Sequence, residues 1–388
     1  DYNRIKGNAC GFAGRGEMKI LITGGAGFIG SHLVDALADK HEIVVLDNLE
    51  PQVHAEKPDY LNPDAAYIFG DMRDEAVLRK ALEGVEVIFH EAAAVGVGQS
   101  MYEIRRYVEV NTMATAKLLD ILVNEENEVK KLIVASSMSI YGEGAYECDN
   151  CGEVYPKLRG EEQLKRREWE LRCPYCGEVV KPIPTSEEKP LHPTSIYAIT
   201  KRDQEEMCLT VGRAYGIPTV ALRYFNVYGP RQSLNNPYTG VCAIFSSRIK
   251  NGKPPLIFED GLQTRDFVSV HDVVRANILA MESSNANYEI FNVGTGEATN
   301  ILEIAYALIK LYNKDKELEP EITNKYRAGD IRHCFADISK IKNKLGFKPG
   351  TALEEGMKEL VEWGEKEEAV DKFDEAHEEL KARGLVEE

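Results

Sequence analysis

The sequence contains no long hydrophobic run, no recognisable secretion signal and no excess of positive charge. No stretch of its 388 residues approaches the roughly 18 apolar residues that a membrane-spanning helix needs. Because the segments of a signal peptide are also missing, we expect a cytoplasmic protein. The 47 Lys and Arg residues face 64 Asp and Glu residues, and the resulting net charge of -17 disfavours nucleic acid and anionic membranes as partners.

A glycine-rich turn between an expected strand and an expected helix is the most informative motif. The apolar run Lys19–Thr23 predicts a strand, and the spacing of apolar residues after Ser31 predicts a helix. Between them, Gly24 allows a tight turn, Gly27 lets the backbone approach a pyrophosphate, and Gly30 lets the helix pack close to the strand. The helix N-terminus adds free N–H donors. This arrangement predicts a dinucleotide site.

An acidic residue follows the second expected strand. Residues 42–46 are apolar after the first position, and Asp47 comes next, 17 residues after Gly30. A carboxylate there accepts hydrogen bonds from both hydroxyls of the adenosine ribose and repels a 2′-phosphate. We therefore expect NAD in preference to NADP. The alternative is an acidic residue that only caps a loop.

Strand and helix patterns alternate from Met18 to about Ile140 and continue after residue 196, as a doubly wound parallel sheet requires. The expected strands are Lys19–Thr23, Ile43–Asp47, Ala66–Phe69, Val87–His90, Leu132–Ser136 and Thr219–Tyr224. The expected helices are Ser31–Ala38, Asp74–Leu82, Tyr102–Asn124 and Tyr197–Tyr215. The expected fold class is therefore α/β with a Rossmann-type doubly wound parallel sheet.

Four of the eight cysteines form two pairs that share a local pattern. Cys148-x2-Cys151 and Cys173-x2-Cys176 are each followed by Gly, Glu and Val, and the glycines allow backbone N–H groups to face the sulfurs. Four thiolates complete a tetrahedral zinc site and leave no position for water, so we expect a structural zinc ribbon. Two disulfides are the alternative. The scattered cysteines, expected to be structural, are Cys10, Cys208, Cys242 and Cys334.

Three further residues have the chemistry of an alcohol dehydrogenation site. Tyr197 and Lys201 lie four residues apart, on one face of an expected helix, and Ser137 ends an apolar strand. An ammonium group bound to the nicotinamide ribose stabilises phenolate, so we expect a Tyr197 pKa below the reference of about 10. Such a tyrosine can remove an alcohol proton as hydride leaves.

In combination, these features resemble the extended short-chain dehydrogenase/reductase family, specifically its nucleotide-sugar epimerases and dehydratases. The resemblance covers about residues 18–363. The motifs that carry it are Thr23-Gly24-x-x-Gly27-x-x-Gly30, Gly70-Asp71-Met72-Arg73-Asp74, His90-Glu91-Ala92-Ala93, Ser137, Tyr197-x3-Lys201, Leu222-Arg223-Tyr224-Phe225-Asn226-Val227-Tyr228-Gly229-Pro230 and Arg265-Asp266-Phe267-Val268.

The resemblance implies roles for individual residues. Ser137, Tyr197 and Lys201 are the implied catalytic residues. The cofactor is expected to contact Gly24, Gly27, Phe28, Ile29, Gly30, Asp47, Asn48, Asp71, Met72, Ala92, Ala93, Ala94, Asn111, Tyr197, Lys201 and Tyr224. The substrate is expected to contact Ser137, Asn226, Arg265, Arg327 and Asp330, with Asn226 and the arginines on the diphosphate and Asp330 on the nucleoside ribose. A homodimer formed through helices 102–124 and 197–215 is also implied.

The residues after Ser137 indicate the subclass. Dehydratases of this family carry an Asp-Glu pair there, and the related decarboxylases usually carry a Glu, whereas this chain has Met138 and Ser139. Oxidation and reduction at one carbon remain, which predicts a 4-epimerase that returns the hydride to either face of carbon 4. The cysteine-rich insert, segment 95–102 and the tail around 383–386 are similar to those of dTDP-L-rhamnose 4-epimerases. UDP-glucose or UDP-N-acetylglucosamine 4-epimerases are the next choice.

Other functions stay open at this stage. A dehydratase or reductase of the same family is one, and an NAD-sensing regulator without catalysis is another. A zinc ribbon also suggests a binding module for nucleic acid, but residues 144–182 hold seven basic and eight acidic residues.

The expected parts are an extension outside the fold (1–17), an NAD-binding domain (18–225), a zinc-ribbon insert within it (144–182), a nucleotide-sugar-binding domain with the chain crossing between the two (226–364), and a C-terminal helix (365–388).

Overall fold

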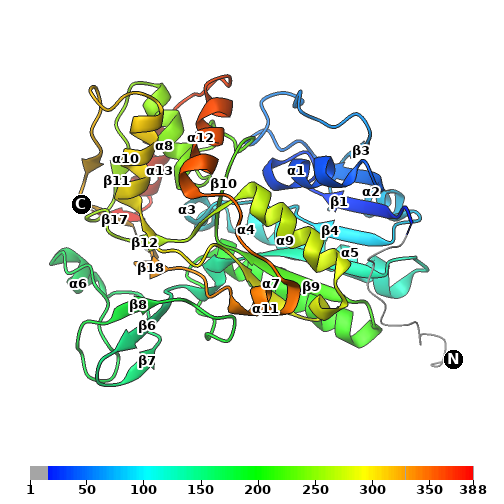
Figure 1. Ribbon diagram of the computed structural model, residues 1–388, viewed down its shortest axis with the longest axis horizontal. Helices are drawn as coiled ribbons and strands as arrows, with labels where there is room; N and C mark the ends of the chain where they lie inside the picture. The colour runs from blue at the N-terminus through cyan, green and yellow to red at the C-terminus, as the bar shows by residue number, and fades with distance from the viewer. Residues whose placement is uncertain (1–15, 328, 388) are drawn as a thin grey trace.

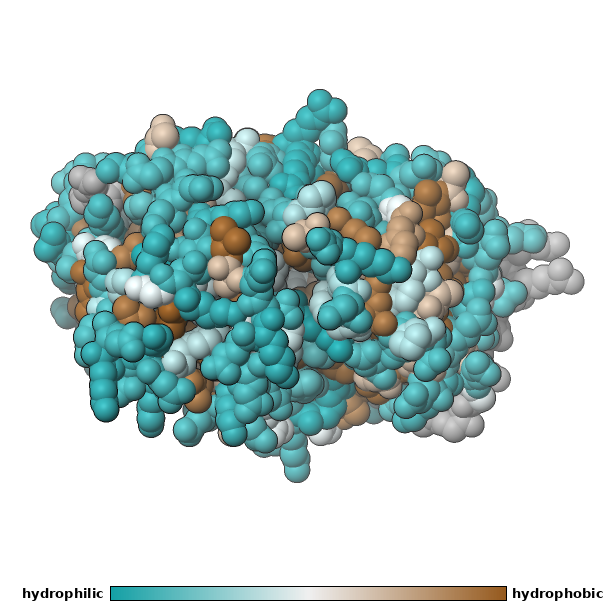
Figure 2. Space-filling model, turned by 90° about the horizontal axis from the view of Figure 1, so that it is seen from above, coloured by the Kyte–Doolittle hydropathy of each residue, from teal (hydrophilic) through white to brown (hydrophobic). Residues whose placement is uncertain are grey.

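The structure is a computed structural model that describes residues 16–327 and 329–387 (Figure 1). Residues 1–15 of the expected N-terminal extension, Cys10 among them, lie outside the described residues. Among the residues that are described, no helix combines the length and apolar character that a membrane span needs. The face in Figure 2 is mainly hydrophilic, with apolar residues in small separate areas.

A seven-stranded parallel sheet forms the centre of the molecule, in the order β14-β9-β5-β4-β1-β2-β3. Its strands are β1 (Lys19–Thr23), β2 (Glu42–Asp47), β3 (Ala66–Phe69), β4 (Val87–His90), β5 (Lys131–Ser137), β9 (Thr219–Tyr224) and β14 (Ile290–Val293). The sheet confirms the predicted fold class. After β3 the order of strands continues on the other side of β1, with β4, and ligands of such sheets bind at the carboxyl ends of the strands where the order reverses in this way.

Helices cover both faces of this sheet (Figure 1). Alternation along β1 explains why, because Ile20 and Ile22 enter one hydrophobic core and Leu21 enters the other. The first core includes α1 (Phe28–Leu37), α9 (Val270–Glu282) and α11 (Ser339–Leu345). The second includes α2 (Glu75–Leu82), α5 (Ala114–Asn124) and α7 (Ile196–Tyr215).

The expected helix Tyr102–Asn124 is interrupted. Short α3 (Val97–Ser100) lies before it, and the helix itself begins as α4 (Ile104–Tyr107), continues as a π-helical segment, Val108–Met113, and ends as α5. The buried Asn111 lies in the π-helical segment, and its side chain bonds the loop after β4 and Thr200 of α7. Periodicity could not reveal this bulge because the apolar spacing continues through it.

The remaining C-terminal elements form a smaller region. Its core lies between α8 (Val241–Lys250), α10 (Ile301–Leu311) and α12 (Leu353–Gly364). The short strands are β10 (Asn226–Tyr228), β11 (Leu256–Ile257), β12 (Thr264–Arg265), β13 (Phe267–Ser269), β15 (Thr299–Asn300), β16 (Glu321–Ile322), β17 (Tyr326–Arg327) and β18 (His333–Cys334). Because α9 and β14 return to the central sheet, the chain crosses between the two regions.

The cysteine-rich insert has a small antiparallel sheet in the order β7-β6-β8. Its elements are β6 (Ala145–Cys148), β7 (Gly152–Val154), α6 (Glu161–Lys165) and β8 (Lys181–Ile183). Six buried residues form its own hydrophobic cluster: Tyr146, Cys148, Val154, Leu171, Cys173 and Val180. In Figure 1 the insert lies below β12 and β18.

The tail differs from the expected helix over residues 365–388. The helix, α13, spans only Phe373–Ala382, and Val370 is exposed and does not join its apolar face. A last strand, β19 (Val386–Glu387), pairs antiparallel with β17. This pairing depends on a distant segment, so the local pattern could not indicate it.

Candidate active site

A cavity of about 470 Å³ lies at the carboxyl ends of the central strands. It is lined by the glycine-rich turn, the ends of β2, β4, β5 and β9, and residues of the smaller region such as Asn226, Tyr238 and Phe267. The position agrees with the switch point between β1 and β4. The cavity therefore joins the predicted dinucleotide site to the C-terminal region.

The glycine-rich turn is shaped as a close approach requires. A Cβ at Gly30 would lie 2.3 Å from the carbonyl oxygen of Gly24, so only glycine lets α1 pack there. Asp47 lies beside the turn, where its Oδ2 accepts the Ala26 N–H at 3.0 Å and its Oδ1 accepts the Leu49 N–H at 2.8 Å. A nearly buried carboxylate and a tight glycine turn thus line one end of the cavity.

Most residues expected to contact a cofactor line this cavity: Gly24, Gly27, Phe28, Ile29, Gly30, Asp47, Asn48, Asp71, Met72, Ala92, Ala93, Ala94, Tyr197, Lys201 and Tyr224. Asn111 is not among the lining residues. Its Oδ1 accepts the Ala94 N–H at 2.7 Å and its Nδ2 donates to the Ala94 carbonyl at 3.1 Å. Asn111 therefore fixes the loop after β4, which lines the cavity, without lining the cavity itself.

His90 holds the cofactor end of the sheet together. Its ring lies within 2.9 Å of Thr23 Oγ1 and 2.8 Å of Thr115 Oγ1, and the Gln204 amide lies at 3.1 Å. The side chain is 1% exposed, and burial lowers its pKa to about 3. His90 is therefore neutral over most of the acid range.

This neutral histidine predicts a specific acid sensitivity. Below about pH 6.5 the unfolded chain binds a proton at His90 that the folded protein does not bind until about pH 3. Stability is therefore lost as pH falls through this window, by about 1.4 kcal/mol per pH unit for this one group. Urea unfolding at pH 6 and at pH 5 measures the free energy of unfolding, and its decrease between the two pH values should be smaller for His90→Asn than for the parent protein. Parallel losses in both proteins would contradict the assignment.

Ser137, Tyr197 and Lys201 meet at the cavity. Ser137 ends β5, and the other two lie on the first turns of α7, whose start is capped by the Ser195 side chain. Lys201 Nζ donates to the Ala135 carbonyl at 2.9 Å. The trio therefore comes from neighbouring elements and shares one space with the glycine-rich turn.

Burial dominates the electrostatics of the trio. It lowers the pKa of Lys201 to about 8, against the opposing charge of Glu91. Burial also raises the pKa of Tyr197, and a hydrogen bond with Ser137 opposes this shift. In the protein without NAD the pKa of Tyr197 is therefore raised, because loss of hydration disfavours phenolate and Lys201 donates to a backbone carbonyl. The expected lowering depends on the nicotinamide ribose and stays a prediction for the protein with NAD bound.

Two side chains at the cavity received no role from the sequence. Glu91 accepts the Tyr224 hydroxyl at 2.8 Å, and burial raises its pKa to about 7. Ser139 donates its hydroxyl to Ser137 Oγ at 2.9 Å and its N–H at 3.1 Å, which leaves the Ser137 proton available for Tyr197. The sequence signal for Glu91 was a carboxylate at the end of an otherwise apolar strand.

The expected substrate residues divide into two groups. Asn226 lines the cavity together with Ser137, whereas Arg265, Arg327 and Asp330 are not among its lining residues. Arg327 Nε donates to Asp330 Oδ2 at 2.8 Å, and the Arg327 guanidinium lies over the Phe258 ring. Arg265 donates to the carbonyls of residues 264, 331 and 332. These charged groups therefore cluster in the smaller region.

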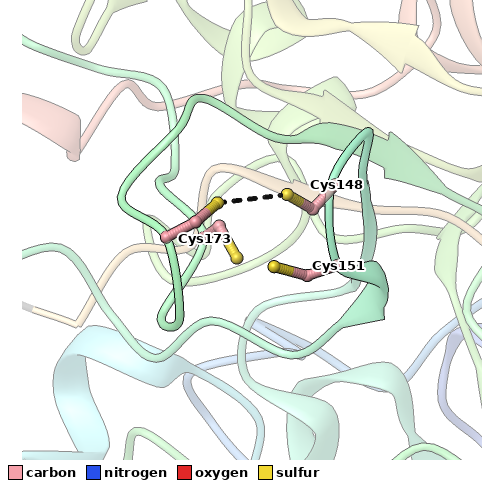
Figure 3. Close-up of side chains that lie close together, drawn as sticks. Cys148, Cys151 and Cys173 are labelled. Atoms are coloured by element: carbon pink, nitrogen blue, oxygen red, sulfur yellow. Dashed lines mark hydrogen bonds between the residues drawn. The ribbon is translucent and has the colours of Figure 1, made fainter.

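The four paired cysteines converge although 21 residues separate the pairs. Figure 3 shows Cys148, Cys151 and Cys173 with their sulfurs facing a common point. All four sulfurs lie within 4.8 Å of one another, and all four thiols are free. Ligand sulfurs of a tetrahedral zinc site lie roughly 3.8 Å apart for bonds of about 2.3 Å. Positive φ angles at Gly152 and Gly177, the glycines after each pair, form the turns.

Comparison with known proteins agrees with this site. Residues 20–167 and 173–294 match the model of the NAD dependent epimerase/dehydratase family. The dTDP-L-rhamnose 4-epimerase of Burkholderia thailandensis is 38% identical over 350 residues, which are 89% of this chain and 94% of that protein.

Two solved structures are similar over nearly their whole length. UDP-glucose 4-epimerase from Thermotoga maritima, with UDP-glucose, is 36% identical with a TM-score of 0.72, covering 90% of this chain and 99% of that one. UDP-glucuronic acid 4-epimerase from Bacillus cereus, with UDP-glucuronic acid and NAD, is 30% identical with a TM-score of 0.73 and the same coverage.

A parallel sheet whose glycine-rich turn, Asp47 and Ser–Tyr–Lys trio share one cavity defines a protein of the short-chain dehydrogenase/reductase type. Within that class, the chain belongs to the NAD dependent epimerase/dehydratase family. The family resemblance deduced from the sequence is confirmed.

Proposed function

We propose that this protein is an NAD-dependent nucleotide-sugar 4-epimerase. The observation that carries the proposal is one cavity lined by the glycine-rich turn, Asp47 and the trio of Ser137, Tyr197 and Lys201. A regulator that only senses NAD has no need of this proton-transfer trio. The two residues after Ser137 provide no carboxyl group, which disfavours a dehydratase. The similar proteins named above are 4-epimerases of three different sugars.

The residues present fit NAD. The Gly30 position has no room for a Cβ, as a tight phosphate-binding turn requires, and the Asp47 carboxylate reaches the cavity from the end of β2. Asp71, with a pKa lowered by its hydrogen bond to Arg73, and the buried Met72 also line the cavity, and the family resemblance implies that they hold the adenine. When bound, NAD supplies a ring that accepts and returns hydride and a positive charge that favours phenolate.

We expect Asp47 to determine cofactor preference. Asp47→Ser removes the charged acceptor for the ribose hydroxyls and the repulsion of a 2′-phosphate, so NAD binding should weaken about ten- to hundredfold while NADP binding appears. Titration with each cofactor measures both changes. Asp39→Ser, at an exposed position beyond α1, is the matched control and should bind as the parent does. A parent protein that already prefers NADP would contradict the proposal.

The trio then divides the proton chemistry at carbon 4. Tyr197 Oη takes the proton of the sugar hydroxyl in the oxidation and returns a proton in the reduction. Ser139 donates to the Ser137 hydroxyl, so the Ser137 proton stays free to orient the sugar hydroxyl. Lys201 holds a positive charge beside the phenolate in the buried site. The keto sugar presents its other face before reduction, which inverts carbon 4.

The nucleotide part of the substrate is proposed to extend toward the smaller region. There Asn226 and the arginines Arg265 and Arg327 match an anionic diphosphate, and Asp330 matches ribose hydroxyls. The similarity to the Burkholderia thailandensis protein supports dTDP-L-rhamnose as the first substrate to test, with UDP-hexoses second. Incubation of the protein with dTDP-L-rhamnose, UDP-glucose and UDP-N-acetylglucosamine, with products identified by NMR, tests the proposal. Inversion of none of these sugars at carbon 4, with NAD bound, would contradict it.

We also propose one structural zinc ion on Cys148, Cys151, Cys173 and Cys176. The four free thiols and their mutual distances support it. A site with four protein ligands activates no water, so the zinc would stabilise the insert and take no part in the reaction. Reduced thiols also suit the cytoplasmic location that we propose.

A homodimer is proposed through α4, the π-helical segment, α5 and α7. Exposed apolar side chains on these elements are Ile104, Val108, Met113 and Ile199. Light scattering at micromolar concentration should give twice the monomer mass, and Ile199→Glu should shift the protein toward monomers. Ile322→Glu is the matched control, since Ile322 in β16 is 43% exposed and Ile199 in α7 is 42% exposed. A monomeric parent protein would contradict the proposal.

A further inference from the structure

A cluster of charged side chains joins the insert to the smaller region. From the insert, Arg159 forms a two-pronged ion pair with Glu259, with N···O distances of 2.8 and 2.9 Å. These side chains are 1% and 4% exposed. Such a buried pair depends on both partners, because either charge left alone would be desolvated without compensation. The insert is therefore attached at a defined position.

Glu170 makes the second attachment. Its Oε1 accepts Arg332 Nη2 at 2.7 Å and Nε at 3.1 Å, and its Oε2 lies 3.1 Å from His333 Nε2. These hydrogen bonds lower the pKa of Glu170 to about 2. The Arg332 side chain is fully buried and also pairs with Asp260. Glu170 thus holds two consecutive residues of segment 330–333.

The backbone of this segment is held on two sides. Glu143, directly before the insert, accepts the N–H groups of Arg332 and His333 at 2.7 and 3.3 Å. Arg159 donates to the Asp330 carbonyl at 3.2 Å. Outside the short strand β18 the segment has no regular structure to maintain its course. Glu143 and Arg159 therefore hold its backbone on the insert side, while Asp260 and Arg265 hold the segment on the side of the smaller region.

The same segment positions the proposed nucleotide-binding side chains. Arg265 donates to the Ile331 carbonyl at 2.7 Å and to the Arg332 carbonyl at 2.9 Å. Asp330, whose backbone Arg159 holds, pairs with Arg327. Contacts from the insert thus lead through residues 330–333 to Arg265, Arg327 and Asp330. Glu170 falls in the short gap between the two stretches that match the family model, whereas Arg159 lies within the first stretch.

We propose that Arg159 and Glu170 are positioning residues through which the folded insert sets affinity for the nucleoside diphosphate part of the substrate. The inference rests on the proposed function, since it takes the ligand to be a nucleotide sugar. Neither residue lines the cavity with Ser137, Tyr197 and Lys201, so hydride and proton transfer do not depend on them. We therefore expect these two residues to change the affinity for the nucleotide and not the rate of the chemical step.

The test compares Glu170→Gln and Arg159→Lys with the parent in the full chain loaded with NAD and zinc. Titration calorimetry with UDP and dTDP should show about ten- to hundredfold weaker binding in both variants, as loss of positioning predicts. KM should rise in parallel, whereas kcat, NAD content and zinc content stay unchanged. Asp149→Asn is the control, because Asp149 forms an exposed ion pair with Lys181 in the same insert, and it should bind as the parent does.

The possible results separate the two proposals. A parent protein that binds UDP or dTDP, with Glu170→Gln binding equally well, overturns the inference and leaves the proposed function intact. A fall in kcat at unchanged KM also overturns it. A parent that binds neither nucleotide overturns the proposed function, and the inference falls with it. Chelation of the metal with NAD retained should weaken nucleotide binding as Glu170→Gln does, and unchanged binding would overturn the connection to the insert.

Discussion

Replacement of Tyr197 by Phe is expected to reduce turnover by about 10²- to 10⁴-fold, the usual contribution of a positioned acid–base group. The phenol is the group of the trio that can both take and return the carbon 4 proton, and it lines the cavity. The aromatic ring remains, so NAD should stay bound. Steady-state kinetics with the preferred nucleotide sugar and NAD released on denaturation measure the two quantities.

Tyr107→Phe is the matched control for this variant. Its ring packs edge to face against Tyr197 with centroids 6.5 Å apart, but its hydroxyl donates to Gln99 and it is not among the residues lining the cavity. This variant should retain most of its turnover. Activity in Tyr197→Phe equal to that of the parent would exclude the proposed mechanism.

The second large effect concerns the metal. The parent should contain about one zinc per chain, and Cys151→Ser should lose it, because three thiolates do not complete the tetrahedral site. The insert has a cluster of only six buried residues, so its order depends on the metal. Limited proteolysis should then cut within residues 144–182 of the variant, whereas the NAD-binding sheet stays folded.

Cys208→Ala provides the comparison for the zinc experiment. Cys208 is a residue of α7 whose side chain lies in the hydrophobic core, far in sequence from both cysteine pairs, and its loss should leave the zinc content unchanged. A parent without metal whose cysteines form disulfides 148–151 and 173–176 would contradict the zinc proposal. Zinc retained in full by Cys151→Ser would contradict it as well.

Local sequence patterns were enough to predict the strands in the N-terminal half of the sheet. Strands such as Lys19–Thr23 are predicted at their observed bounds, because a buried parallel strand is a short apolar run between turn residues. Helix starts were less accurate: α1 begins at Phe28 and not near Ser31, since the glycine turn itself provides the first helical residues. Glycine lowers helix propensity, which hid this start.

Elements that depend on distant partners were not predictable. Strand β14 has four residues and exists through pairing with β9, and β19 exists through pairing with β17. The raised pKa of Tyr197 in the protein without NAD also depends on distant partners. The sequence shows a lysine four residues away, but only the folded protein shows that Lys201 donates to the Ala135 carbonyl.

The sequence by itself determined the class of chemistry, because the glycine spacing, Asp47, the Tyr197–Lys201 pair and the paired cysteines each express a local requirement of backbone or ligand geometry. The tertiary structure decided how these parts are connected. Segment 330–333 contacts Glu170 on one side and Arg265 on the other, although 160 or more residues separate it from Glu170. Such contacts arise from packing between separate regions, and no local periodicity encodes them.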